Sequence, residues 1–238
     1  MLTSLRISPR LTKYFKGFCS SPEVIMLFVY MKCRFSLSYR ELEEMASIRG
    51  IFVDHATIQR WVIRFARLLD WQIRKNKKPV GSSWRMDETY IKVEGQWAYL
   101  YRAVDSSGNT IDFLLRKQRD AAAAKAFFRK AFKYNGLPHK VTIDKSGSNI
   151  AALKQANKLL PKNAQIEIRQ VKYLNNIVEQ DHRFIKKRTK PMLGFKSFRA
   201  AQITISGIEN IRMIQKRQIV GSNNNATTFE NFKMLMAS

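Results

Sequence analysis

Three acidic residues occupy positions from which their carboxylates can meet. Asp87 lies inside WRMDETYIKV, a run of aromatic and β-branched residues that predicts a strand. Asp144 directly follows residues 140–143, a second predicted strand, and Glu179 lies near the start of a helix predicted over residues 176–188. Three carboxylates without a histidine or cysteine cluster suit Mg²⁺ or Mn²⁺. Two such ions would activate a water or a 3′-hydroxyl and stabilise the leaving oxygen of a phosphodiester.

Each of these acids also has a simpler explanation. Asp87 is the hardest to explain structurally, because Asp is depleted in strands. Strand alternation puts it on the face opposite Glu88. Asp144 can be a turn or cap residue. Glu179 can be a capping-box acid, since it is the third residue of a helix that Asn176 would cap. For each acid, the metal-ligand role and the structural role both stay open.

The helix that begins near Glu179 is strongly basic. Positions i+3, i+4 and i+7 from this acid lie on its face of the helix, and all three carry basic side chains or histidine. The residues of this helix that we expect to contact DNA are His182, Arg183, Lys186, Lys187 and Arg188. Ion pairing on a solvated helix is the alternative. Glu179 and His182 also form an E-x-x-H pair, but the sequence holds no second pair for a di-iron site.

The elements around these acids predict an α/β domain. Strands are predicted over residues 83–93, 96–104, 110–115, 140–143 and 165–170. Helices are predicted over residues 121–134, 150–160, 176–188 and 198–215. Three antiparallel strands that lead into alternating helices and strands predict a mixed sheet with helices on both faces. Trp97, Tyr99 and Tyr101 alternate on one strand and are expected in the core.

The first third of the chain predicts a helical domain. Helices are expected from residue 22, over residues 39–46 with Ser38 as cap, and from 55 to about 69 with Asp54 as cap. A helix, a turn with Gly50 and a helix that opens with polar and basic residues form a helix-turn-helix pattern. Its outward residues, expected to contact DNA, are Thr57, Gln59, Arg60 and Arg64. A helical hairpin with a solvated basic face is the alternative.

Composition points to a polyanionic partner. The 238 residues include 43 Lys and Arg against 18 Asp and Glu, a net charge of +25. An excess of this size on a foldable chain is typical of nucleic-acid binding. Cys19 and Cys33 fit no paired metal or redox spacing, which favours free thiols in a reducing compartment. The longest apolar run, residues 24–31, is far shorter than the roughly 20 residues of a membrane-spanning helix.

Several motifs resemble one known family. WRMDETYIKVEGQWAYLYRAVDSSGNTIDFLL, VTIDKSGSN, IRQVKYLNNIVEQDHRFIKKR and MLGFKSF resemble the DDE transposases of bacterial insertion sequences, with the insertion sequence six family as the best match. SYRELEEM and VDHATIQRWV resemble that family's helix-turn-helix. The resemblance covers about residues 20–217. It implies a ribonuclease-H-like catalytic domain in which Asp87, Asp144 and Glu179 bind metal and Lys186 is the family's basic residue.

The resemblance implies a function and a domain plan. We expect a Mg²⁺-dependent transposase that holds two ions, with Mn²⁺ as a second usable metal. It would act on double-stranded DNA as a homo-oligomer, in the bacterial cytoplasm at the nucleoid and without a membrane partner. It would bind terminal inverted repeats, expose 3′-OH ends and join them to target DNA. Alternatives are a decayed transposase that only binds DNA and a structure-specific nuclease. The predicted parts are a basic arm (1–20), a helix-turn-helix domain (21–74), a linker (75–82), a catalytic domain (83–217) and a polar tail (218–238).

Overall fold

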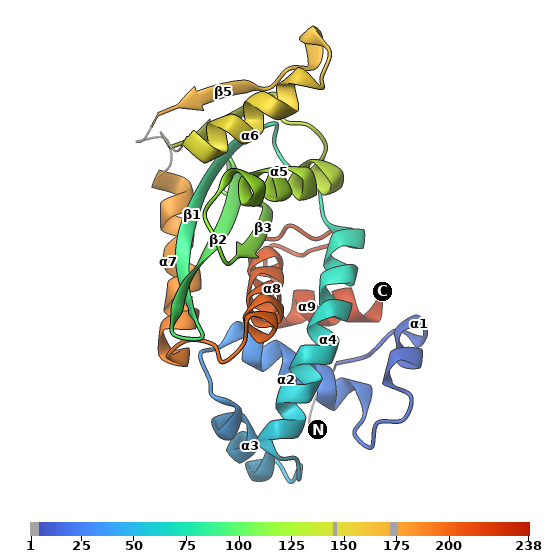
Figure 1. The fold of residues 1–238 in the computed structure, drawn as a ribbon. Coiled ribbons are helices and arrows are strands. Elements are labelled where there is room, and N and C mark those ends of the chain that lie inside the picture. Colours follow the sequence, from blue (N-terminus) through green and yellow to red (C-terminus); the bar gives the residue numbers. More distant parts are fainter. Residues whose placement is uncertain (1–4, 145–146, 172–175) are drawn as a thin grey trace. The chain divides into compact units, whose positions relative to one another are not determined.

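The structure is a computed structural model that describes residues 5–144, 147–171 and 176–238. It divides into two compact units, one built from Met1–Lys78 and Arg199–Ser238 and the other from Pro79–Phe198. The first unit is helical and the second contains the sheet (Figure 1). Within the described residues, no helix combines the length and the apolar character needed to cross a membrane.

The second unit is built on a five-stranded mixed sheet. Its strands are β1 (Ser83–Val93), β2 (Gln96–Asp105), β3 (Thr110–Arg116), β4 (Lys140–Ile143) and β5 (Glu167–Gln170). The strand order is β3-β2-β1-β4-β5. β1, β2 and β3 pair antiparallel, while β1, β4 and β5 pair parallel. This is the predicted ribonuclease-H-like mixed sheet, so the fold class is confirmed.

Helices cover both faces of this sheet. They are α5 (Ala121–Asn135), α6 (Gly147–Lys158) and α7 (Asn176–Thr189), with short 3₁₀ turns η2 (Lys162–Ala164) and η4 (Lys190–Met192). α5 and α6 lie together on one face and α7 lies on the other (Figure 1). Trp84 and Met86 of β1 are buried beneath α5 and α6 with Phe127 and Leu153. Strand alternation therefore turns the neighbouring odd-numbered residues of β1, Asp87 among them, toward α7.

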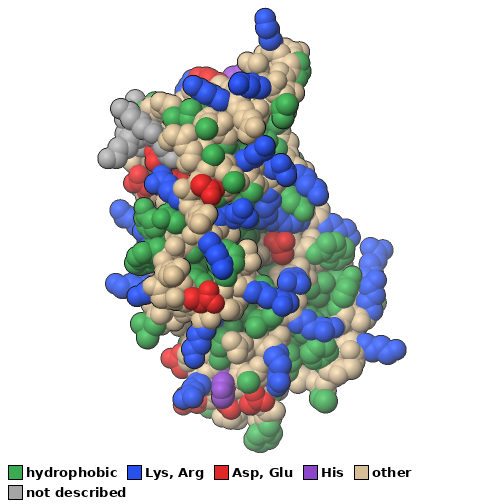
Figure 2. Space-filling model, viewed as in Figure 1, with side chains coloured by type: hydrophobic (Ala, Val, Ile, Leu, Met, Phe, Trp, Pro, Cys, Tyr) green, Lys and Arg blue, Asp and Glu red, His purple; other side chains and the backbone are tan. Residues whose placement is uncertain are grey.

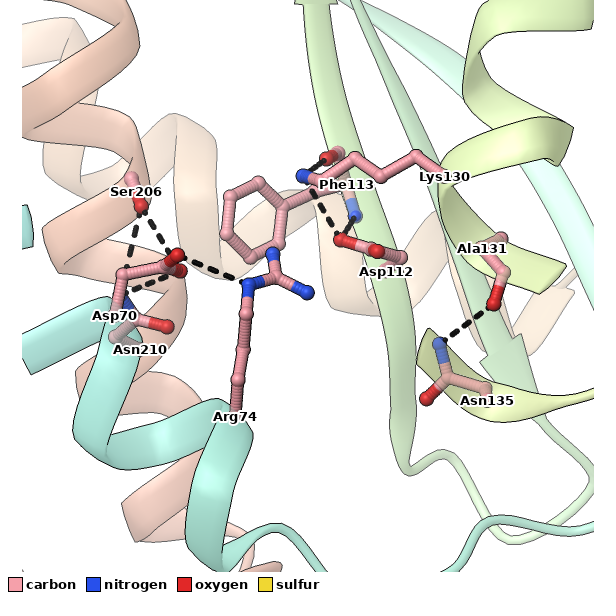
Figure 3. Close-up of polar contacts among 9 residues, drawn as sticks. All are labelled: Asp70, Arg74, Asp112, Phe113, Lys130, Ala131, Asn135, Ser206 and Asn210. Atoms are coloured by element: carbon pink, nitrogen blue, oxygen red, sulfur yellow. Dashed lines mark hydrogen bonds and ion pairs between the residues drawn. The ribbon is translucent and has the colours of Figure 1, made fainter. Parts of the chain in front are cut away.

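α5 is tied to the sheet edge by a charged contact (Figure 3). Lys130 pairs with the buried carboxylate of Asp112 at 3.0 Å and donates to the carbonyl of Phe113 at 2.6 Å. Its ammonium also lies 4.6 Å from the centre of the Phe113 ring. The helix is thereby fixed against β3, while its apolar face fills the core.

The first unit contains the helices on which the helix-turn-helix prediction rests. Its elements are α1 (Pro9–Thr12), η1 (Lys13–Phe15), α2 (Pro22–Arg34), α3 (Tyr39–Ile48), α4 (His55–Asn76), α8 (Phe198–Gln215) and α9 (Thr228–Ala237). The predicted capping box at the start of α3 is confirmed, because Ser38 and Glu41 bond each other's backbone N–H. The Asp54 carboxylate likewise caps α4 by accepting from the N–H of Thr57 at 2.8 Å.

The compact units do not follow the predicted domain boundaries. α8, expected in the catalytic domain, packs on the N-terminal helices: Ser206 and Asn210 contact Asp70 of α4 at 3.4 and 3.2 Å (Figure 3). A Cβ at Gly207 would lie 2.4 Å from the Sγ of Cys33, so only glycine lets α8 approach α2 this closely. α4 itself extends to Asn76, into the segment predicted as a linker.

The described part of the predicted arm, residues 5–20, and the predicted tail both belong to this helical core; residues 1–4 lie outside the described residues. Phe15 is buried and stacks on Phe65 with ring centres 4.4 Å apart. Phe232 of α9 is fully buried, and the N–H of Ser8 donates to the carbonyl of Met236 at 2.9 Å. In both the arm and the tail, the few apolar residues are spaced among polar ones, so neither segment shows a strong apolar periodicity in the sequence. Each acquires its core role only through tertiary contact.

Candidate active site

An acidic cluster lies where β1 passes the end of β4. The parallel register pairs Arg85 with Thr142, which brings Asp87 level with Asp144, two residues further along each strand. One carboxylate oxygen from each of Asp87, Glu88 and Asp144 lies within 4.8 Å of the others. Sheet topology thus brings two of the three predicted acids together.

Glu88 belongs to the cluster although strand alternation puts it on the face of β1 opposite Asp87. Its side chain is 4% exposed and accepts from Arg119 at 3.3 Å and from Asn149 at 3.1 Å. The same Arg119 reaches the carboxylate of Asp144 at 3.3 Å. β1 continues beyond its last pairing with β4, so side chains from both faces can converge at that open edge. In the sequence, the only sign that Glu88 joins the cluster is that it directly follows Asp87.

The electrostatics of the cluster fit a divalent cation. Burial, together with the charges of Glu88, Asp144 and Glu179, raises the pKa of Asp87 to about 7. Burial also raises the pKa of Glu88, partly offset by Arg119. Carboxylates crowded in this way bind protons because their charges repel, and a hard cation with oxygen ligands removes that repulsion. Asp87 and Asp144, with Glu88 beside them, are the residues that would hold such a cation.

Glu179 lies outside this close cluster. It is on α7, and its side chain is exposed. Within the described residues, the group of acids close enough to share one ion comprises Asp87, Glu88 and Asp144. The charge of Glu179 nevertheless contributes to the raised pKa of Asp87, which places it near the same site. The structure therefore brings the third predicted acid into the neighbourhood of the cluster, without ligand contact.

Comparisons with known proteins identify the family. A family model described as a DDE domain matches residues 81–218. The chain is 40% identical over 204 residues to the transposase of the insertion sequence-like element IS431mec from Staphylococcus aureus, covering 86% of this chain and 89% of that protein. The chain belongs to the DDE transposases of bacterial insertion sequences. A second relative, the transposase of IS257 in transposon Tn4003, shows the same identity and coverage.

Two of the solved structures similar to the chain are integrase catalytic core domains. The HTLV-2 integrase catalytic core domain in complex with magnesium aligns with a TM-score of 0.46 and 15% identity, over 64% of this chain and 96% of that chain. The catalytic core domain of BIV integrase aligns with a TM-score of 0.44 and 16% identity, over 63% of this chain and 92% of that chain.

His182 of the transposase faces the cluster rather than solvent. It is 5% exposed, and its Nδ1 lies 3.7 Å from Oδ2 of Asp87. Burial, with Arg102 and Lys186 nearby, lowers the pKa of His182 to about 3, so the ring is neutral and this contact is not an ion pair. The predicted DNA contact by His182 is therefore corrected. An i+3 residue is turned by about 60° from residue i, which here points it toward the sheet.

The other predicted DNA contacts are accessible to varying degrees. Arg183, Lys186 and Lys187 are exposed on α7, and Arg188 is partly exposed over the ring of Phe184. On α4, three of the predicted contacts are exposed and Thr57 is partly buried; the exposed ones are Gln59, Arg60 and Arg64. The buried side of α4 holds Ile58 and Val62, as its apolar periodicity predicts. Basic side chains spread widely over the face shown in Figure 2.

Proposed function

We propose that the transposase cleaves DNA at the ends of its element and joins the 3′-OH ends to target DNA at the cluster of Asp87 and Asp144. The observation that supports this proposal is the convergence of these carboxylates at the β1–β4 edge, inside the segment matched by the DDE family. Glu179 would complete the ligand set from α7 when DNA and metal are bound.

The chain's own residues hold the reacting groups in place. Bound Mg²⁺, or Mn²⁺ in its place, would activate the attacking oxygen and stabilise the leaving one, with two ions sharing these roles. Asp87 and Asp144 provide oxygen ligands, and Arg119 fixes the orientation of Asp144 and of Glu88. The neutral ring of His182 packs against Asp87 and shields one side of it from water.

DNA recognition is assigned to two basic surfaces. The helix-turn-helix, residues 21–74, would bind the terminal inverted repeats with the start of α4 in the major groove. There Arg60 donates to Thr57 at 2.7 Å, and the Thr57 hydroxyl donates to Asp54 at 2.8 Å, so the guanidinium is held at the helix start. Arg183, Lys187 and the other exposed cations of α7 would bind phosphates beside the cluster. Holding two element ends on double-stranded DNA requires at least two subunits.

A transposition assay tests this function directly. A donor plasmid carries the gene with its flanking DNA, and a second plasmid serves as target in the presence of Mg²⁺. We expect joined products from the wild-type chain and none from Asp87→Asn or Asp144→Asn. Glu167→Gln is the matched control, because Glu167 is an exposed acid of the same unit, paired with Arg169. Cleavage without joining would identify a nuclease, and end binding without either reaction would identify a DNA-binding protein.

A further inference from the structure

A hollow of about 650 Å³ lies beyond the acidic cluster, between the end of β1 and the end of α7. All of its lining residues belong to the unit that contains the sheet. Those that matter here are Tyr90, Lys92, Trp97, Lys186, Lys190 and Leu193. None of them has a part in the carboxylate cluster.

The chain forms one wall of this hollow by a specific backbone contact. The N–H of Phe195 donates to the carbonyl of Lys92 at 3.0 Å, and the N–H of Glu94 donates to the carbonyl of Phe195 at 2.7 Å. Gly194 has φ of +95°, and a Cβ there would lie 3.3 Å from the Lys92 carbonyl oxygen. Glycine thus permits both the backbone conformation and the close approach. The segment after η4 is therefore held against the edge of β1.

Two aromatic side chains stand exposed at this hollow. Trp97 is 62% exposed and Tyr90 is 50% exposed, which corrects the expectation that Trp97 lies in the core. Their ring centres are 6.2 Å apart at an interplanar angle of 72°. Trp97 precedes the part of β2 that is covered by helices, so alternation alone does not bury it. Large aromatic faces left accessible beside a hollow are suited to contact a flat apolar ligand.

The charge of the lining selects a polyanion. Lys92, Lys186 and Lys190 are exposed, and the described lining residues include no Asp or Glu. Stacking faces combined with lysines match single-stranded nucleic acid, in which bases stack on aromatic rings and phosphates meet the cations. An apolar protein segment would use the aromatic rings but gain nothing from three lysines.

The hollow lies close enough to the carboxylate cluster for one DNA strand to reach both. Tyr90 is three residues beyond Asp87 along β1, a path of roughly 10 Å. Lys186 is seven residues beyond Glu179 along α7, again roughly 10 Å. With about 3.4 Å per nucleotide step along one strand of B-DNA, the hollow lies about three steps from the reacting phosphate.

We infer that this hollow holds an unpaired base of the reacting DNA strand, about three nucleotide steps from the reacting phosphodiester. Trp97 and Tyr90 contact the base, and Lys92 and Lys190 bind the adjoining phosphates. The inference rests on the proposed function for the identity of the strand, and it adds a single-strand site separate from the carboxylates.

The test measures binding of single-stranded oligothymidylate to the full chain by fluorescence anisotropy, in EDTA so that no chemistry takes place. Trp97→Ala should weaken binding roughly 5- to 150-fold, the loss expected for one stacked base. Trp97→Phe should restore most of it. Trp71→Ala is the matched control, because Trp71 is also an exposed tryptophan, 48% exposed on α4. The affinity of the Trp71→Ala chain for oligothymidylate should equal that of the wild type. Lys92→Ala should reduce the slope of log affinity against log salt by about 0.7.

Each result separates this site from the proposed function. Unchanged oligothymidylate affinity in both Trp97→Ala and Lys92→Ala overturns the base site, even if the wild-type chain joins DNA. Loss of self-association in sedimentation by Trp97→Ala, with DNA affinity unchanged, would make the hollow a protein contact and likewise overturns it. A wild-type chain that never joins DNA refutes the proposed function, whatever Trp97 does. Should Trp97→Ala fail to fold, Lys92→Ala decides the question, because an unchanged salt slope in that variant overturns the base site.

Discussion

Arg102 of β2 donates from Nη2 to Oδ2 of Asp181 of α7 over 2.7 Å, with both side chains buried. Arg102 is paired with Asp87 in the β1–β2 register, and Asp181 follows Glu179 by two residues. This ion pair therefore fastens the helix that carries Glu179 to the strand beside Asp87. The ion pair thus holds Glu179 in a defined position near the cluster, although Glu179 itself makes no contact with the other acids.

Removing one partner of this pair should damage both stability and joining. Asp181→Ala leaves the Arg102 charge buried beside the sheet, which costs about 3–5 kcal/mol in comparable cases. We expect a lower denaturation midpoint in urea and loss of joining. Glu167→Ala breaks the exposed pair with Arg169, also 2.7 Å long, and should leave the midpoint unchanged. Equal midpoints for the two variants would contradict a structural role for the buried pair.

The raised pKa of Asp87 predicts a pH-dependent stability without metal. The folded chain binds this proton more tightly than the unfolded chain does, since the pKa rises from 3.8 to about 7. The stability that protonated Asp87 provides is full below about pH 4 and is lost as pH rises toward 7. Asp87→Asn should therefore raise the melting temperature in EDTA at pH 8 more than at pH 5. Mg²⁺ should raise the melting temperature of the wild-type chain at pH 8 and leave that of Asp87→Asn unchanged. If the melting temperatures of the two chains in EDTA differ by the same amount at pH 5 and pH 8, the raised pKa of Asp87 is refuted.

Arg119 should act as a positioning residue for Asp144. Arg119→Gln removes the charge that bridges Glu88 and Asp144, so we expect slower joining that is partly restored by higher Mg²⁺ concentration. Glu88→Gln keeps an acceptor for Asn149 and should reduce joining less than Asp87→Asn does. Joining rates measured across a Mg²⁺ titration distinguish the variants. If Glu88→Gln is as inactive as Asp87→Asn, Glu88 is itself an essential ligand.

The helix-turn-helix assignment predicts a loss of specific binding from one side chain. Arg60→Ala should weaken binding to the DNA flanking the gene by about 1–3 kcal/mol if Arg60 contacts a base edge. The full chain is needed for this gel-shift titration, because α8 and α9 complete the unit that contains α4. Arg129→Ala, which removes an exposed arginine from α5, is the control. Equal losses for the two variants would indicate phosphate binding without sequence recognition.

The sequence predicted what depends on local pattern and missed what depends on edges and tertiary contact. Asp87 and Asp144 were found because strand centres and strand ends are visible in the sequence. Glu88 lies on the face opposite Asp87, as alternation predicts, and contacts Asn149 of α6 there. Its membership of the cluster was missed because alternation takes no account of an open strand edge, where side chains from both faces can converge. His182 was predicted to contact DNA because its helix is basic, although the sheet lies against that side of the helix. The packing of α8 with the N-terminal helices depends on Gly207 and Cys33, which no periodicity singles out.

Glu179 provides the sharpest test of the three-carboxylate site. Its side chain is exposed, so Glu179→Gln should leave the melting temperature without metal nearly unchanged. A neutral amide is a poor ligand for Mg²⁺, so joining should be lost while end binding remains. A capping acid would tolerate this change, because Gln also serves in a capping box. Glu167→Gln applies the same substitution to another exposed acid of the unit and should retain joining. Full joining by the Glu179→Gln chain would leave Glu88 as the third carboxylate of the site, because it already lies within 4.8 Å of the other two.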